Sequence, residues 1–386
     1  MRDVAIAWQL YVLTGSPLSL GLLGAFRAVP MIAFALWGGA LADALDRRRV
    51  LLVTQSALTL TSATLAWLAF TGSATPATLY ALVAASSVAT AFDNPARQSL
   101  VVNLLPREDL ANGLTLGIFG WQVATVVGPA LGGVLLASLG IEAIYLIDTV
   151  SFAGVLGALL VVRPRAQERD ERALPKSVSL RAIGEGYRFL RTKPVLVWLM
   201  LIDFFATFFA GAMLLMPIYA DQILGVGTEG LGVLTSAPAV GSLVASAFLA
   251  TRAPIVKQGP VVLVAVAIYG VSMAAFGLST SFVLSLALLA IAGAADTVST
   301  VIRQVVRQTM TPDALRGRMT SINMIFFMGG PQLGEVEAGA VAEATSPPVS
   351  VVSGGLACVL VAVLAALFVP ALRSLREEER PRRLDA

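Results

Sequence analysis

The chain has 386 residues, of which 57% are hydrophobic and only 13% are charged, and its formal net charge is +3. Soluble domains carry about 25% charged residues, so this chain has too few charges to cover a water-facing surface of its size. It contains no histidine, which excludes Ser-His-Asp catalysis, histidine metal sites and histidine proton relays. A single cysteine, Cys358, excludes an internal disulfide. We therefore expect an all-α integral membrane protein that is not an enzyme and needs no cofactor or metal ion.

Twelve apolar runs follow one another along the chain, separated by turn sequences such as "TGSP" (14–17) and "GVGTEG" (225–230). Most runs reach the roughly 20 residues with which a helix crosses about 30 Å of hydrocarbon. Because a helix satisfies its own backbone hydrogen bonds, we predict twelve transmembrane helices. The runs lie near residues 3–14, 18–42, 50–71, 77–99, 111–138, 143–162, 194–220, 229–251, 259–278, 282–302, 319–344 and 347–371.

The first run is short, because only about a dozen apolar residues precede Thr14, fewer than a spanning helix needs. We expect the first helix to be truncated at its start, through a misassigned start codon or an incomplete chain. A truncated, non-functional copy is therefore one interpretation of the sequence. We expect no cleavable signal peptide, because the first residues lack a basic run followed by an apolar core.

Lysine and arginine residues alternate between the connections. Connections after odd-numbered runs contain none, whereas the others hold almost all of them, including Arg47 to Arg49 and nine between Arg163 and Lys193. By the positive-inside rule the basic connections are cytoplasmic. With an even number of spans, both termini are predicted to lie in the cytoplasm and the chain to be a multi-pass protein of the plasma (inner) membrane.

A polar, proline-containing segment divides the runs six to six. Within it, "SLRAIGEGYRFLR" (179–191) places apolar residues at helical spacing, which predicts an amphipathic helix on the cytoplasmic membrane surface. The predicted domains are an N-terminal six-helix bundle (1–162), a central loop (163–193), a C-terminal six-helix bundle (194–372) and a cytoplasmic tail (373–386).

The two halves are related in sequence. "RQSLVVNLLPREDL" (97–110) resembles "RQVVRQTMTPDAL" (303–315), with arginine, glutamine and proline aligned at one offset, and "GPALGG" (128–133) pairs with "GPQLGE" (330–335). Many transporters consist of two parallel repeats of six helices, related by an axis along the membrane normal. The duplication therefore predicts two similar bundles.

Six plus six helices, a basic central loop and the loop after the second run resemble the major facilitator superfamily. The superfamily signature in that loop is G-x-x-x-D-R-x-G-R-R, and Gly39, Asp43, Arg47 and Arg48 match it, whereas alanine and aspartate replace its first arginine and second glycine. The resemblance implies that this loop closes the cytoplasmic side and favours the outward-open state. The alternative is that the loop only anchors the topology.

Physical chemistry assigns roles to the charged residues of this loop. Asp43, at a helix end, can accept hydrogen bonds from the N-terminus of a neighbouring helix. Arg47 and Arg48 can pair with carboxylates such as Asp93. We expect Asp93 and Arg97, in "DNPAR", to form a structural ion pair.

The fifth run contains a second signature. "VVGPALGG" is similar to the antiporter signature G-x-x-x-G-P-x-x-G-G of the superfamily, with matches at Gly128, Pro129, Gly132 and Gly133. The signature is associated with exporters, although such small residues also serve ordinary tight helix packing. Longer stretches, such as "LTGSPLSLGLLGAFRAVP", look like the branch that contains enterobactin exporters and macrolide and drug efflux proteins.

Ionisable residues inside the apolar runs are candidate functional groups, because unpaired charge at the bilayer centre is costly. Asp3, Asp203, Asp296 and Glu335 are candidates for proton coupling. Carboxyl groups shielded from water can exchange protons near neutral pH, and no histidine is available for this role. Asp3, Asp296 and Glu335 rank first, because the resemblance places their helices at the central cavity.

Other charges in the runs have structural interpretations. Asp148 and Asp203 can cap helices or pair with Arg27. Glu337 stands two residues from Glu335, so the two side chains cannot share a helix face.

We predict a secondary active transporter that exports a bulky amphipathic small molecule, such as a siderophore, drug or macrolide, by alternating access with proton antiport. Because a fold does not fix a function, an importer, a facilitator and a lipid transporter are the alternatives. The expected partners are a small-molecule substrate, protons and the lipid bilayer, with no nucleic acid, and we expect a monomer.

Overall fold

The computed structural model describes residues 1–44, 46–104, 106, 109–161, 188–252, 255–312 and 315–375. Every regular element in these ranges is a helix, which confirms the predicted all-α fold. Most of the predicted amphipathic helix falls in 162–187 and most of the predicted tail in 376–386, both outside the described residues.

The first half of the chain forms a bundle whose helix ends follow from local sequence. Gly15 ends the first helix in the left-handed region at φ 62°, and Asp46 caps the third by accepting bonds from the backbone N–H groups of Arg48 and Arg49. Gly140, with φ 82°, joins two helical segments within α5. The helices are α1 (Arg2–Thr14), α2 (Pro17–Ala44), α3 (Arg47–Phe70), α4 (Pro76–Leu104) and α5 (Leu110–Val161).

The second half forms a similar bundle, in which short helices follow the first long one. Proline begins α7 and α13, where a missing backbone N–H costs nothing. The elements are α7 (Pro194–Phe209), η1 (Met213–Leu215), α8 (Met216–Ile218), η2 (Tyr219–Ile223), α9 (Gly227–Ala250), α10 (Gln258–Leu278), α11 (Phe282–Met310), α12 (Arg316–Ala344), α13 (Pro347–Phe368) and α14 (Pro370–Arg373).

Eight described segments are long and apolar enough to cross a membrane. The stretch 115–161 in α5 counts once among them and contains both the fifth and the sixth predicted runs. The segments do not include α1, α4 or α12. The helices follow the order of the predicted runs, and the number of twelve spans stays a prediction.

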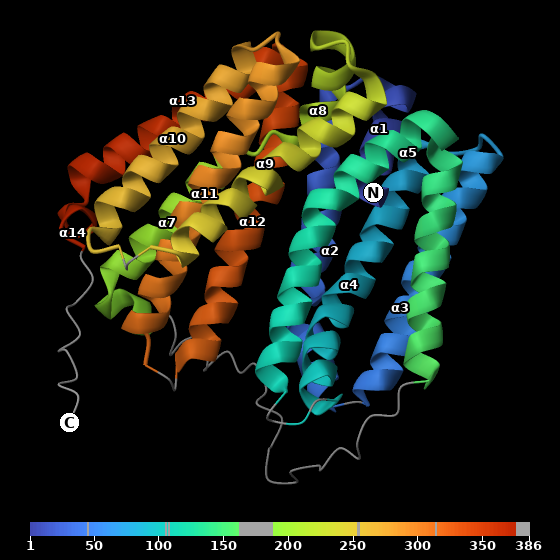
Figure 1. Cartoon of the computed structure of the whole chain (residues 1–386), viewed down its shortest axis with the longest axis horizontal. Helices are drawn as coiled ribbons and strands as arrows, with labels where there is room; N and C mark the ends of the chain where they lie inside the picture. The colour runs from blue at the N-terminus through green and yellow to red at the C-terminus, as the bar shows by residue number, and fades with distance from the viewer. Residues whose placement is uncertain are drawn as a thin grey trace.

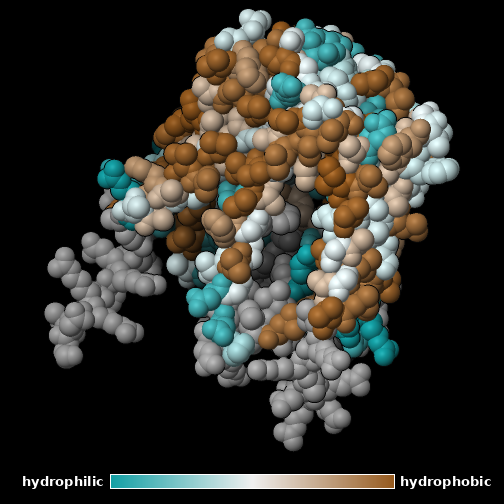
Figure 2. Space-filling view, turned by 45° about the vertical axis from the view of Figure 1, so that its right-hand side comes forward, coloured by the Kyte–Doolittle hydropathy of each residue, from teal (hydrophilic) through white to brown (hydrophobic). Residues whose placement is uncertain are grey.

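The two bundles meet at the upper end and diverge toward the lower end (Figure 1). The lower end is where α3, α7 and α12 begin, so the basic connections gather there. Figure 2 shows a hollow between the bundles and hydrophobic residues over much of the outer surface. Such a surface suits contact with lipid tails, and large exposed apolar side chains include Trp67, Leu278, Val283 and Phe368.

Candidate functional site

The crossing of α2 and α12 joins the two bundles through glycines. A Cβ atom added at Gly21 would lie 2.5 Å from the carbonyl oxygen of Glu335 and 3.0 Å from Cα of Gly339. One added at Gly24 would lie 2.5 Å from the carbonyl oxygen of Gln332. Side chains are therefore excluded here, and the two backbones approach as closely as in other small-residue membrane crossings.

The crossing of α5 and α9 has the same construction. A Cβ atom at Gly133 would lie 2.5 Å from Cα of Gly232, and one at Gly232 would lie 2.8 Å from the carbonyl oxygen of Pro129. In both crossings the second helix of one bundle meets the fifth helix of the other, counting the segment of α5 before Gly140 as the fifth. This twofold relation is what the duplication in the sequence implies.

The crossing places part of the predicted antiporter segment between the bundles. Pro129 and Gly133 lie in the contact with α9. Gly132 instead lies against Met1, and a Cβ atom added at Gly132 would lie 3.0 Å from Cα of Met1. The nearest described atom to a Cβ at Gly128 is the Met1 nitrogen, at 3.7 Å. Tight packing thus accounts for two of the four residues at this crossing.

Polar side chains also connect the bundles at the upper end. The hydroxyl of Tyr11 donates to Oδ2 of Asp221 at 2.5 Å and accepts from Nε2 of Gln222 at 3.0 Å. The hydroxyl of Ser16 donates to Oε2 of Glu343 at 2.7 Å. Sequence analysis missed these contacts, because no local pattern distinguishes them from other polar residues near helix ends.

Asp3 and Glu335, two predicted proton carriers, lie in one cluster that spans both bundles. Nη2 of Arg27 lies 3.3 Å from Oδ1 of Asp3, although it makes no hydrogen bond within the described residues. Oε2 of Glu335 is buried and has no hydrogen-bond partner there either. A Cβ atom at Gly24 would lie 2.8 Å from this oxygen, so the carboxyl group sits against α2, one turn before Arg27.

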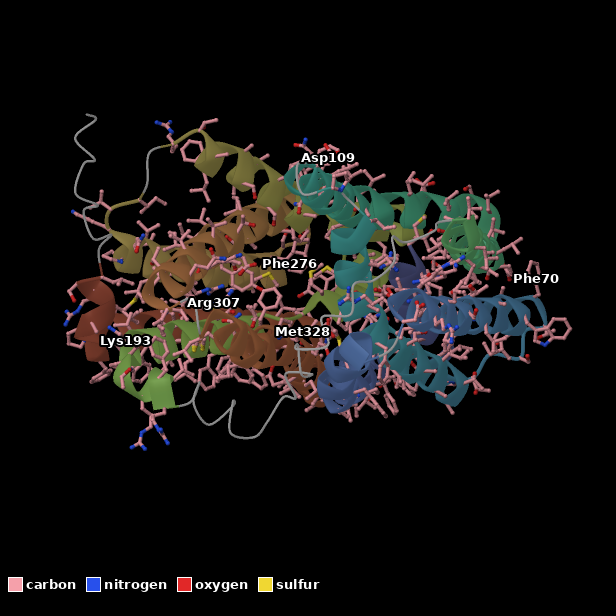
Figure 3. All side chains as sticks on the ribbon, turned by 90° about the horizontal axis from the view of Figure 1, so that it is seen from below. Phe70, Asp109, Lys193, Phe276, Arg307 and Met328 are labelled. Carbon is pink, nitrogen blue, oxygen red and sulfur yellow. The ribbon has the colours of Figure 1, made fainter. Side chains whose placement is uncertain are left out.

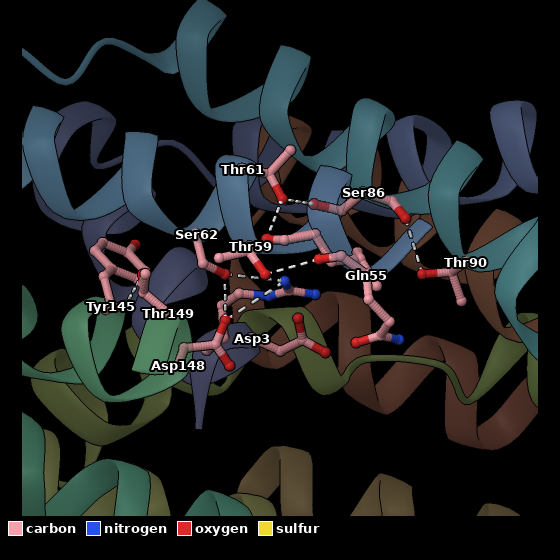
Figure 4. Close-up of polar contacts among 12 residues, drawn as sticks. Asp3, Gln55, Thr59, Thr61, Ser62, Ser86, Thr90, Tyr145, Asp148 and Thr149 are labelled. Atoms are coloured by element: carbon pink, nitrogen blue, oxygen red, sulfur yellow. Dashed lines mark hydrogen bonds and ion pairs between the residues drawn. The ribbon is translucent and has the colours of Figure 1, made fainter. Parts of the chain in front are cut away.

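The pairing of Arg27 with Asp148 or Asp203 was a wrong expectation. Asp148 instead lies 3.5 Å from Nη1 of Arg2 and accepts a hydrogen bond from Ser62, and Figure 4 shows this polar network among α1, α3 and α5. Arg27 faces Asp3 because α1 and α2 are neighbours in the N-terminal bundle, whereas Asp203 belongs to the other bundle.

Asp203 and Asp296, the other two predicted carriers, share one arginine of the C-terminal bundle. Nη2 of Arg303 lies 2.6 Å from Asp203 and 4.0 Å from Asp296. It also donates to the hydroxyl of Thr300 at 2.8 Å. The side chains of Arg303 and Asp203 are only 9% and 8% exposed, whereas that of Asp296 is 44% exposed. The ion pair of Asp203 with Arg303 is thus buried, and Asp296 is the more accessible acid.

The predicted ion pair between Asp93 and Arg97 is confirmed, with Nη2 of Arg97 at 2.7 Å from Oδ2 of Asp93. The other carboxylate oxygen accepts from Thr54 at 2.8 Å and Gln55 at 2.7 Å. Asp93 is therefore fully occupied by groups of α3 and α4.

The suggested pairing of Arg47 and Arg48 with Asp93 is wrong in this structure. Arg48 instead donates to the carbonyl oxygens of Leu159 and Leu160, at 2.8 and 2.7 Å. Carbonyl groups at the end of a helix lack intrahelical partners, which makes them suitable acceptors for an arginine. Nε of Arg47 is buried without a hydrogen bond among the described residues. The surroundings of Gly39 and of the Asp43 side chain lie outside what the structure describes.

The described residues contain no group of three or more acidic, cysteine or histidine side chains that could hold a metal ion. Their charged groups instead form separate ion pairs inside each bundle and one cluster between the bundles.

Known proteins are similar to this chain over almost its whole length. The chain is similar to the multidrug efflux pump Tap of Mycolicibacterium fortuitum, with 28% identity over 98% of this chain and 93% of Tap. It is 24% identical to the enterobactin exporter EntS of Escherichia coli O127:H6, over 98% of this chain and 89% of EntS.

The fold is also similar to a solved structure, a bacterial homologue of the human lysosomal transporter Spinster in an inward-facing and occupied conformation. The TM-score is 0.72 at 16% identity, covering 96% of this chain and 94% of the homologue. The model of the family described as transmembrane secretion effector matches residues 1–383. The chain therefore belongs to this family of major facilitator transporters and is a multi-pass protein of the membrane, not an enzyme.

Proposed function

We propose that this transporter exports a bulky amphipathic small molecule, such as a siderophore or macrolide drug, in exchange for protons that Glu335 carries. The observation that supports the proposal most directly is the Glu335 carboxyl group at the α2–α12 crossing. Its Oε2 atom is buried without a hydrogen-bond partner within the described residues, and the neighbouring charges are Arg27 and Asp3 of the other bundle.

The surroundings of Glu335 suggest how protonation and movement are linked. An ionised carboxylate that is buried without a partner is costly, so we expect Glu335 to hold a proton while α2 and α12 are packed together. Separation of these helices would admit water and allow the proton to leave. The carboxylate could then compete with Asp3 for Arg27, whose Nη2 makes no hydrogen bond within the described residues.

Two further arguments support export as the direction of transport. The efflux pump Tap and the exporter EntS are similar to this chain over 98% of its length, which supports export. If the basic lower end is cytoplasmic, the hollow between the bundles opens toward the cytoplasm, where an exported solute enters. Both termini would then be cytoplasmic, and the loop with Gly39, Asp43, Arg47 and Arg48 would close this side when the bundles rock apart at the upper end.

The test uses the protein in liposomes that enclose a pH-sensitive dye. A panel of siderophores and macrolides is added in turn, and both solute transport and proton movement are recorded. We expect at least one solute to drive proton movement, and Glu335→Gln to reduce that movement at least about tenfold, as for other essential proton-transfer groups.

Glu337→Gln is the matched control, because Glu337 lies two positions along the same helix and faces another direction. It should retain coupled proton movement. Coupling that persists in Glu335→Gln but disappears in Asp3→Asn or Asp296→Asn would assign the proton to another carboxylate. Solute transport without any proton movement in the unmodified protein would refute antiport.

A further inference from the structure

A second polar feature lies inside the C-terminal bundle, away from the crossings. A partly open cavity of about 200 Å³ is lined by residues of α7, α11 and α12. One wall is polar and belongs mainly to α11, where Thr300, Arg303 and Arg307 recur every three or four residues and so share a helix face. Figure 3 labels Arg307 among the helices of this bundle, seen from the lower end.

The rest of the lining is mainly apolar, although α7 also contributes Asp203 and α12 contributes Asn323. Leu199 and Met200 of α7 contribute to it, together with Phe327 of α12. A ligand in the cavity would therefore have an apolar surface on one side and cationic and hydrogen-bonding groups on the other. Cavities of this kind, apolar with a few placed polar groups, are typical of small-molecule sites.

The two arginines of the polar wall differ in their partners. Arg303 is neutralised by Asp203 at 2.6 Å, with Asp296 at 4.0 Å. Arg307 is half-buried, and it has no hydrogen bond or ion pair with any residue that the structure describes. The acid that acts on Arg307 is Asp203, whose carboxylate is already occupied by Arg303. Among the described residues, the cavity wall therefore carries one cation without a direct partner.

We propose that this cavity is a binding subsite for an amphipathic organic anion, whose carboxylate pairs with Arg307 and whose apolar body packs against Leu199, Met200 and Phe327. A guanidinium group matches a carboxylate with two parallel hydrogen bonds. A cavity of about 150 Å³ accommodates benzene in another protein, so this one has room for an aromatic ring with one charged substituent. The inference rests on the proposed export function and names the chemical class of its substrate.

Three ligands of nearly equal shape test the charge preference directly. They are 4-fluorobenzoate, neutral 4-fluorobenzamide and cationic 4-fluorobenzamidinium, and fluorine NMR measures their binding to the full chain in lipid nanodiscs. We expect the benzoate to bind about tenfold more tightly than the benzamide, in the range of one charge-assisted hydrogen-bonded pair. The benzamidinium should bind most weakly.

Arg307→Gln should remove the preference for benzoate and leave benzamide binding unchanged. Arg307→Lys keeps the charge but not the two-pronged geometry, so benzoate binding should weaken about threefold. Arg252→Gln is the matched control, because this arginine carries the same charge at the end of α9 and lies over the ring of Phe248, outside the cavity. It should bind all three ligands as the unmodified protein does.

Equal binding of benzoate and benzamide by the unmodified protein would refute the proposal, as would preferred binding of benzamidinium. A loss of benzoate binding in Arg252→Gln as large as in Arg307→Gln would also refute it, because the effect would then be one of general surface charge. If Arg307→Gln does not fold, Arg307→Lys decides, and unchanged benzoate affinity in that variant would contradict the assignment. Export coupled to protons can be measured separately, so failure of this subsite leaves the proposed function to its own test.

Discussion

The two bundles differ in the exposure and the ion-pair partner of one repeated arginine. Arg97 and its counterpart Arg303 stand at one offset of 206 residues in the duplicated sequence. The side chain of Arg97 is 51% exposed and pairs with Asp93 of its own helix, whereas that of Arg303 is 9% exposed and pairs with Asp203 of another helix. The residue that corresponds to Asp93 is Ser299 (93 + 206), whose hydroxyl is buried without a partner among the described residues.

The two glycine crossings between the bundles, in contrast, are alike. Gly133 meets Gly232 in one crossing and Gly21 meets Gly339 in the other, with backbone in contact in each case. The same pair of helices, the second and the fifth, thus meets through glycine in both crossings, although the glycines differ, since Gly133 aligns with Glu335 in the duplicated segments. The charge pairs diverged, because an acid on any neighbouring helix can neutralise an arginine.

The largest expected effect is a loss of transport when a bulky side chain is placed in either crossing, which tests whether the two crossings are equivalent. We expect Gly133→Leu and Gly339→Leu each to reduce transport in liposomes at least about tenfold, because side chains forced into a packed contact cost about 1–3 kcal/mol or more. Gly120→Leu is the control, since among the described residues no atom of another helix lies within 4 Å of a Cβ there. A normal rate in only one of the two crossing variants would show that the crossings are not equivalent.

The next effect sharpens the difference between the arginine sites. Asp203→Asn leaves the buried Arg303 with only the more distant Asp296, and we expect a loss of stability of about 3–5 kcal/mol, as for other broken buried ion pairs. The readout is the midpoint of thermal unfolding of the purified protein in detergent. Adding Arg303→Gln should recover part of the loss, and a single variant as stable as the unmodified protein would contradict a structural ion pair.

The equivalent change in the N-terminal bundle should cost less. Asp93→Asn keeps an oxygen that can accept hydrogen bonds from Thr54 and Gln55. It removes the negative charge that pairs with Arg97, but the side chain of Arg97 is exposed and water can solvate it. We expect a loss of about 1 kcal/mol by the same thermal assay. A loss as large as that of Asp203→Asn would mean that the two ion pairs contribute equally to stability.

The smallest effect concerns the polar contacts at the upper end. Glu343→Gln keeps an oxygen that can accept from Ser16, and the contact is exposed to solvent. We expect transport to change less than about twofold, because exposed polar pairs contribute little. A tenfold change would show that this contact, and not the glycine crossings, holds the bundles together.

Much of the fold could be predicted from the sequence, because its signals are local. Apolar runs and turn residues identified the helices in order, and Gly140 separates the fifth and sixth runs at the turn expected between them. The duplicated motifs predicted two similar bundles. The pair of Asp93 and Arg97 was also predictable, since residues four apart on a helix are neighbours.

The candidate site was less predictable, although all its carboxylates were identified. Asp3 and Glu335 were named separately, yet the structure places them in one cluster around Arg27, and Asp203 and Asp296 share Arg303. The spacing of Gly21 and Gly24 was the available signal for the crossing beside Glu335. Arg307 had no local signal, because it is distinguished only by the lack of a partner among the residues that the structure describes.

Local information in the chain was therefore sufficient for the membrane class, the helix order and the repeated halves. A membrane helix satisfies its backbone hydrogen bonds within one continuous segment, so its existence is written in that segment. Which charges meet was decided only when the helices packed, because the partner of a side chain depends on the rotation of each helix and on the angle at which it crosses its neighbours. Arg97 and Arg303 show this most clearly, since one repeated residue acquired two different partners.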